Sequence, residues 1–232
     1  MAFKIALTAG HYKNTAGKRC LKTLDPNETR EWVLNDRIAD KVEKLLQAYD
    51  GYLLIRTDDT TGENEITLTA RTNAANNFKA DIYISIHHNA GIGGGSGGGI
   101  VAYVWSGLNK VKHASTFEWQ KALYDSLIKY TGLKGNRATP LATADHHETR
   151  ETNMPAVLLE LGFMDSKTDV PIILTEEYAD KCAKAIVEVI VAKGELTEKK
   201  VEAPAPAPEP KTIAAEILVK ELKARGYNAV LL

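Results

Sequence analysis

Three polar side chains in this sequence follow or close short apolar runs, in positions where the strands of a sheet would end. His11 follows FKIALTAG, His87 follows DIYISI, and Glu160 closes PAVLLE. Ligands of open α/β sheets bind outside the carboxyl ends of the strands. One histidine at such a position is more often a hydrogen-bonded surface residue, but three polar groups that converge on one edge favour a functional site.

A fourth polar residue, Glu31, lies on a predicted amphipathic helix. At about 100° per residue, Glu31 falls on the same helix face as Leu34, Ile38 and Val42. Glu28 lies at the edge of this apolar stripe, where it can face solvent and complete a capping box. Because a buried carboxylate without a partner is costly, we expect Glu31 to face a cation, and a metal ion would satisfy it.

Two histidines and a carboxylate that leave one position open are typical of a catalytic zinc site. The sequence separations of His11, Glu31 and His87 match no compact metal motif, so the fold has to bring them together. A glutamate that is not a ligand usually acts as the general base beside such a zinc ion, and Glu160 fits that role. The predicted chemistry is hydrolysis of an amide or ester by a metal-activated water.

The elements that must position these residues alternate between strands and helices along the chain. Apolar, β-branched runs predict strands at residues 3–9, 52–56, 82–86, 100–105 and 155–163. Helical periodicity predicts helices between Asp25 and Gly51 and at residues 67–78, 110–130 and 169–193. In the first helix we expect Asp25 as N-cap, Pro26 at the first helical position and Gly51 as the stop. This alternation predicts an α/β fold with a mostly parallel sheet covered on both faces.

A change of composition after residue 194 divides the chain. Residues 195–211 mix charges with Ala-Pro repeats, which is typical of an extended linker. Residues 212–232 predict one helix, a stop at Gly226 and a short strand. So short a segment cannot build an independent core, so we expect a fragment of a C-terminal domain after the main unit of residues 1–194.

The overall composition is that of an ordinary globular protein. The 232 residues are 44% hydrophobic and 25% charged, with a formal net charge of −1. We therefore expect no nucleic-acid partner, and no membrane insertion, because no apolar run is long enough for a span. The segment MAFKIALTAGHY lacks the features of a secretory signal, so we expect a protein without a visible signal peptide, or one whose leader was removed. Cys20 and Cys182 are expected to be free thiols.

Four segments of the sequence resemble the zinc-dependent N-acetylmuramoyl-L-alanine amidases, a family of bacterial autolysins, sporulation amidases and phage endolysins. They are TAGH ending at His11, ETREWVLNDRIADKV from Glu28, YISIHHNA from Tyr83 and RETNMPAVLLELGFMDS from Arg150. The resemblance covers about residues 2–193. It implies the family's fold, a mixed, largely parallel sheet flanked by helices, and peptidoglycan as the substrate.

The resemblance also implies roles for the four polar residues. His11, Glu31 and His87 match the ligands of one zinc ion per chain, and Glu160 matches the catalytic glutamate. Neighbouring strand residues point to opposite faces, so at most one of the two adjacent histidines faces the site. The resemblance assigns His87 to it, and it implies that His88, at a position that similar sequences can fill with a non-ligating residue, packs or lines the cleft. The implied reaction cleaves the amide bond between the lactyl group of N-acetylmuramic acid and the L-alanine of the stem peptide, with Glu160 as general base and acid.

Candidate substrate contacts lie in segments close to these motifs. Asn14 and Lys18 belong to GHYKNTAGK, which stands where the family more often has GHGG. Asn89 follows the histidine pair, and Arg137 matches a family position near the cleft, where it can bind a carboxylate of the stem peptide. The glycine-rich loop Gly91–Gly99 is expected to be mobile, and it either borders the cleft or is a plain connector.

Other interpretations of these residues remain open. His146 or His147 in ADHHETR would be a further ligand only if the three-ligand set were incomplete. A zinc carboxypeptidase-like peptidase would need an arginine to hold a C-terminal carboxylate, which Arg137 or Arg150 would supply. A non-catalytic cell-wall-binding protein would have no need for the buried acids, and it need not retain zinc.

The expected setting is the bacterial cell wall. The proline-rich tether and the absence of a visible leader favour a phage or prophage endolysin over a secreted autolysin. The segment AAEILVKELKARGYNAVLL weakly resembles half of a sporulation-related repeat that binds glycan. We therefore expect cell-wall glycan binding through residues 212–232.

Overall fold

Six strands form the central sheet of the main unit, in the order β3-β1-β4-β7-β5-β6. The computed structural model describes residues 2–199 and 210–226. The six strands are β1 (Phe3–Ala9), β3 (Tyr52–Arg56), β4 (Ile82–Asn89), β5 (Ile100–Trp105), β6 (Leu141–Ala144) and β7 (Ala156–Phe163). Neighbouring strands run parallel except β5 and β7, which are antiparallel. The prediction of an α/β fold with a mixed, mostly parallel sheet is confirmed.

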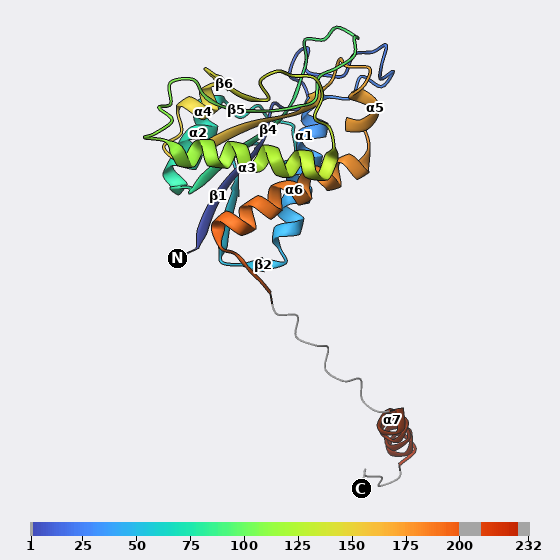
Figure 1. The fold of residues 1–232 in the computed structure, drawn as a ribbon. Helices are drawn as coiled ribbons and strands as arrows, with labels where there is room; N and C mark the ends of the chain where they lie inside the picture. The colour runs from blue at the N-terminus through green and yellow to red at the C-terminus, as the bar shows by residue number, and fades with distance from the viewer. Residues whose placement is uncertain (1, 200–209, 227–232) are drawn as a thin grey trace. The chain divides into compact units, whose positions relative to one another are not determined.

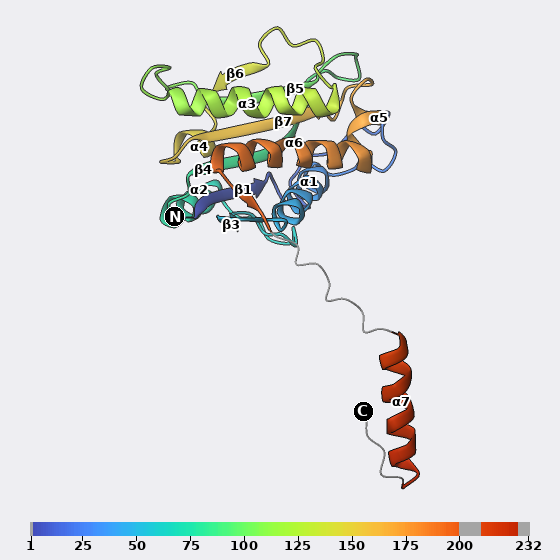
Figure 2. The ribbon, with the colours of Figure 1, turned by 60° about the horizontal axis from the view of Figure 1, so that its bottom comes forward.

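Helices cover both faces of this sheet (Figure 1). The large core lies under α1 (Glu31–Leu46), α3 (Ala114–Thr131) and α6 (Glu176–Gly194), and α6 contacts both of the others. Figure 2 shows α3 and α6 lying side by side across the sheet. A smaller core on the other face includes residues of α2 (Leu68–Phe78). The short helix α4 (His147–Arg150) packs against α2 and β7. The central strands are therefore buried on both sides, which explains their continuous apolar runs.

The strand order brings together the ends that carry the candidate site residues. β1 pairs in parallel with β4, and Ala9 lies opposite Ile86. β4 pairs in parallel with β7, and His87 lies opposite Glu160. The carboxyl ends of β1, β4 and β7 therefore form one edge of the sheet, as the site prediction requires.

The first helix begins later than predicted. α1 starts at Glu31, after Arg30 as N-cap, and not at Pro26. The Asp25 carboxylate instead closes a turn, accepting hydrogen bonds from the backbone N–H groups of Asn27 at 3.1 Å and Thr29 at 2.7 Å. Glu28 has a φ of 49°, in the left-handed region, so no helix can run through it.

The same helix ends before the predicted stop. α1 ends at Leu46, and the short strand β2 (Tyr49–Asp50) follows before Gly51. β2 pairs with β8 (Thr197–Glu198), which lies within the segment predicted as linker. Gly51, between β2 and β3, has a positive φ of 93°, which glycine adopts without a steric cost.

Other boundaries also differ from the prediction. The helix expected at 169–193 is two helices, α5 (Val170–Ile173) and α6, because the Thr175 side chain caps a new helix by accepting a hydrogen bond from Tyr178 N. Strand β4 extends to Asn89, and α3 begins at Ala114. β6 and α4 were not predicted. Their four residues each are too few to show a period.

The second unit, Lys200–Leu232, contains the helix α7 (Pro210–Ala224). This helix agrees with the helix predicted to follow residue 212, whereas the short strand predicted after Gly226 lies outside the described residues. In the ranges that the structure describes, no helix is long and apolar enough to cross a membrane.

The glycine-rich loop Gly91–Gly99 is tied to the turn that follows β7. One Asp165 carboxylate oxygen accepts hydrogen bonds from the backbone N–H groups of Gly91, Ile92 and Gly93, at 2.8, 2.7 and 2.6 Å. At the other end of the loop, the buried Asp169 carboxylate accepts from Gly99 N at 2.7 Å. These contacts argue against the mobile loop that its composition suggested.

We therefore expect Asp165→Ala to release this loop. Three backbone N–H groups would lose a charged acceptor, so the free energy of unfolding should fall by about 1–3 kcal/mol, and amide exchange at Gly91–Gly93 should accelerate. Glu177→Ala, which removes an exposed acid paired only with Lys181, is the matched control. Equal exchange rates and unfolding midpoints in the two variants would contradict this role for Asp165.

Candidate metal centre

His11 is held at the carboxyl end of β1 by a buried arginine. Its backbone φ is 69°, a conformation that a non-glycine residue adopts only when its surroundings enforce it. The Arg71 guanidinium donates hydrogen bonds to the carbonyl oxygens of Ala9 at 2.7 Å and His11 at 2.8 Å, and to Thr8 Oγ1 at 2.8 Å. Arg71 therefore fixes the turn that presents the His11 ring.

Glu31 is the first residue of α1 and is fully buried, as its position on the apolar stripe predicted. Its Oε2 lies 3.3 Å from His11 Nε2, and its Oε1 lies 3.1 Å from His87 Nδ1. Oε1 also accepts a hydrogen bond from the backbone N–H of His88 at 3.2 Å. The structure thus brings together the three residues predicted as ligands, although they are far apart in the sequence.

The two adjacent histidines have different surroundings. His88 is 2% exposed, and its Nδ1 lies 2.8 Å from Asn35 Oδ1. Asn35 in turn donates to Gly10 O at 3.1 Å. Burial lowers the pKa of His88 to about 3, so the ring is neutral and can donate to the Asn35 oxygen. His88 therefore packs inside and ties α1 to β4, while His87 faces Glu31.

The cluster of His11, Glu31 and His87 fits a divalent metal ion. One ligand atom from each residue lies within 4.8 Å of the others. Among the described residues, His11 Nε2 and Glu31 Oε2 are buried without a hydrogen-bond partner, which is unusual for such atoms unless an ion or water satisfies them. Two imidazole nitrogens and one carboxylate oxygen form a donor set that zinc prefers, with a position left for a water.

The charges at this cluster also favour a cation. Burial opposes ionisation of Glu31, but the adjacent His11 and His87 rings hold its pKa well below the ordinary value. Burial likewise opposes a charge on His87, whereas the carboxylates of Glu148 and Glu31 raise its pKa to about 10. A positive charge among these groups, supplied by a proton or by a metal ion, is therefore stabilised.

Glu160 lies on β7 directly opposite His87 in the sheet, outside the three-residue cluster. Its Oε2 is buried and makes no hydrogen bond to any residue in the described ranges. Burial raises the pKa of Glu160 to about 7, with the charge of His87 opposing and that of Glu31 adding to the shift. A carboxyl group with such a pKa can both take and give a proton near neutral pH.

One buried acid near the cluster was not predicted. Glu148 in α4 is 3% exposed, and its Oε2 lies 3.5 Å from His87 Nε2. The segment ADHHETR drew attention to His146 and His147, which lie outside the three-residue cluster. The periodicity of the sequence does not predict the burial of Glu148, because its proximity to β4 depends on how α4 packs against the sheet.

Residues 5–192 match the family described as N-acetylmuramoyl-L-alanine amidase. The chain belongs to the N-acetylmuramoyl-L-alanine amidase family. The fold agrees: a solved amidase from Clostridium difficile 630 superposes with a TM-score of 0.70 at 24% identity, over 84% of this chain and 97% of that one.

Curated members of the family are similar over part of their length. N-acetylmuramoyl-L-alanine amidase CwlM of Bacillus licheniformis is 34% identical over 142 residues, which is 60% of this chain and 50% of the relative. The sporulation-specific amidase of Bacillus subtilis is 30% identical over 161 residues, 68% of this chain and 57% of the relative. The endolysin of Bacillus phage SPP1 is 29% identical over 200 residues, 86% of this chain and 69% of the endolysin.

The structure of this amidase-family chain places the predicted substrate contacts at different distances from the cluster. Lys18 Nζ lies 3.7 Å from Glu31 Oε2. Asn14 is exposed in the loop after β1, and Asn89 is the last residue of β4. The Arg137 guanidinium lies 4.9 Å from the centre of the Phe163 ring, which ends β7. None of these positions by itself shows a substrate contact.

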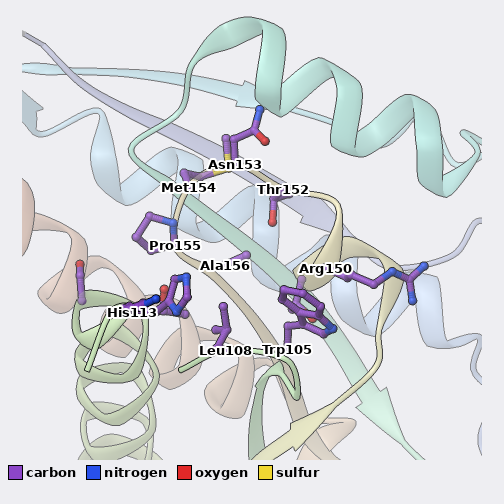
Figure 3. Close-up of a pocket in the computed structure, with 13 residues that line it drawn as sticks. Trp105, Leu108, His113, Arg150, Thr152, Asn153, Met154, Pro155 and Ala156 are labelled. Carbon is purple, nitrogen blue, oxygen red and sulfur yellow. The ribbon is translucent and has the colours of Figure 1, made fainter. Parts of the chain in front are cut away.

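One hollow over the sheet is lined by Val101, which pairs with Glu160, and another lies near the start of β7. The first, of about 270 Å³, is also lined by Tyr103 and Arg137. The other, of about 330 Å³, is drawn in Figure 3 and is lined by Trp105, Pro155 and Ala156, the first residue of β7. Because β7 begins at Ala156, this second hollow lies at the end of the strand away from the metal cluster.

Gly10 leaves room for the His87 ring. A Cβ added to Gly10 would lie 2.1 Å from His87 Cε1 and 2.4 Å from both ring nitrogens. We expect Gly10→Ala to displace this ring and to weaken zinc binding at least about tenfold, measured by competition with a chromophoric chelator. Gly95→Ala is the control, because its added Cβ would lie 3.3 Å from Ile92 Cγ2 and O, a tight contact but much longer than that at Gly10, and it would not meet a proposed ligand. Wild-type affinity in Gly10→Ala would show that His87 is not held as described.

Proposed function

We propose that this chain is a zinc-dependent amidase that cleaves peptidoglycan between N-acetylmuramic acid and the L-alanine of the stem peptide. The observation that supports it best is the buried cluster of His11, Glu31 and His87, with Glu160 next to it on the neighbouring strand. The family match supports the substrate. Because the chain spans about half the length of the first two curated relatives, the activity of the whole protein belongs to this proposal.

In this proposal His11, Glu31 and His87 hold the metal, and Glu160 moves the proton. A bound zinc ion would supply a Lewis acid for the lactyl carbonyl and lower the pKa of a water. Glu160 accepts a proton from the attacking water as the oxygen bonds to the carbonyl carbon. It then donates that proton to the alanine nitrogen as the amide C–N bond breaks, so the carboxylate is regenerated. A pKa near 7 suits both transfers.

Substrate binding would use the cationic groups around the cluster. Lys18 stands beside Glu31, and Arg137 lines a hollow together with Val101, which pairs with Glu160 in the sheet. Both are exposed and positively charged, so they suit the carboxylates of a stem peptide. We propose Asn14 and Asn89 as further polar contacts. Asn14 lies in the loop that follows His11, and Asn89 ends the strand that carries His87.

We propose the cell wall as the site of action and a phage or prophage endolysin as the biological setting. A relative named as an endolysin covers 86% of this chain, although relatives named as bacterial amidases match as well. In this proposal residues 1–194 perform the chemistry, residues 195–211 are a linker, and residues 212–232 contribute to binding cell-wall glycan.

Glu160→Gln tests the mechanism. The amide has nearly the same shape but cannot take a proton, so turnover should fall by roughly 10²–10⁴-fold while the protein still binds one zinc ion. Release of peptides with a free amino-terminal alanine from purified peptidoglycan measures turnover, and elemental analysis measures zinc. The exposed substitution Glu177→Gln is the control. A Glu160→Gln variant with control-level turnover would overturn the assignment of the general base.

A further inference from the structure

The buried carboxylate of Glu148 has no role in the mechanism above, yet it lies against a proposed ligand. Tyr83 Oη donates a hydrogen bond to Oε1 at 2.6 Å, and Ser85 Oγ donates to Oε2 at 3.2 Å. His87 Nε2 lies 3.5 Å from Oε2. Tyr83, Ser85 and His87 alternate along β4, so all three point to the face of the sheet that α4 covers.

The two nitrogens of the His87 ring face two different carboxylates. Nδ1 lies 3.1 Å from Glu31 Oε1, whereas Nε2 is buried, makes no hydrogen bond to any described residue, and lies 3.5 Å from Glu148 Oε2. A neutral imidazole has one N–H and one lone pair. If Nδ1 gives its lone pair to a metal, Nε2 must carry the hydrogen, and a buried N–H needs an acceptor.

We propose that Glu148 is a positioning residue for metal binding. Its carboxylate accepts the Nε2–H of His87, which fixes the ring orientation and keeps the Nδ1 lone pair directed at the metal. This inference rests on the proposed metal centre and adds to it a residue that lies outside the ligand set. Histidine ligands whose second nitrogen is held in this way bind metal about 10–100-fold more tightly than those without the partner.

A purely structural role for Glu148 makes a different prediction. Tyr83 belongs to the small core under α2 and α4, and removing the carboxylate would leave the Tyr83 hydroxyl buried without its acceptor. In that case a loss of zinc affinity would follow from local unfolding. Removing the Tyr83 hydroxyl as well would then restore the zinc affinity. The two roles can therefore be distinguished by adding Tyr83→Phe to the Glu148 variant.

The experiment measures the zinc dissociation constant of the full chain by chelator competition, with the thermal unfolding midpoint recorded in parallel. We expect Glu148→Leu to bind zinc about 10–100-fold more weakly than the wild type. Glu148→Gln keeps the shape and an acceptor oxygen but loses the charge, so we expect an intermediate affinity. Tyr83→Phe leaves the contact between Glu148 and His87 intact, so we expect wild-type affinity.

The double variant Tyr83→Phe/Glu148→Leu decides between the two roles. Recovery of the unfolding midpoint without recovery of zinc affinity supports the positioning role. Recovery of both would overturn it, as would wild-type affinity in Glu148→Leu and Glu148→Gln. A wild-type protein that binds no zinc would instead contradict the metal centre itself, so failure of the inference and failure of the proposed function are distinguishable.

Discussion

The site depends on one buried negative charge, the Glu31 carboxylate at the start of α1. An ion of this kind is costly to bury unless it is paired, and its pairing involves His11, His87 and the backbone of His88. The first turn of a helix also favours a negative charge. For Glu31 to occupy that turn, α1 must begin after Arg30, so the turn closed by Asp25 is part of what builds the site.

The sheet supplies the partners of this charge through its strand order. β1, β4 and β7 are parallel neighbours, so one edge carries His11, His87 and Glu160. Buried polar residues then hold the two histidines or the backbone that carries them. Arg71 holds the backbone of His11, Asn35 and His88 tie α1 to the strands, and in our proposal Glu148 holds the ring of His87.

Much of this arrangement can be predicted from the sequence, because it follows from local patterns. The bounds of β1, β3 and β5 match the apolar runs, and the helix periodicity correctly buried Glu31. The predicted start of α1 was wrong because the carboxylate of Asp25 can accept backbone hydrogen bonds in a turn as well as at a helix N-cap. The direction of β5 and the approach of Glu148 to His87 depend on tertiary packing, which no periodicity encodes.

In our proposal this buried cluster hydrolyses the bond between muramic acid and alanine. Mass spectrometry of purified peptidoglycan after digestion tests it most directly, with chelator-treated protein as the control. We predict free stem peptides that begin with alanine, together with glycan strands that have no new reducing ends. Shortened stem peptides still attached to muramic acid would contradict the claim and would indicate a zinc peptidase instead.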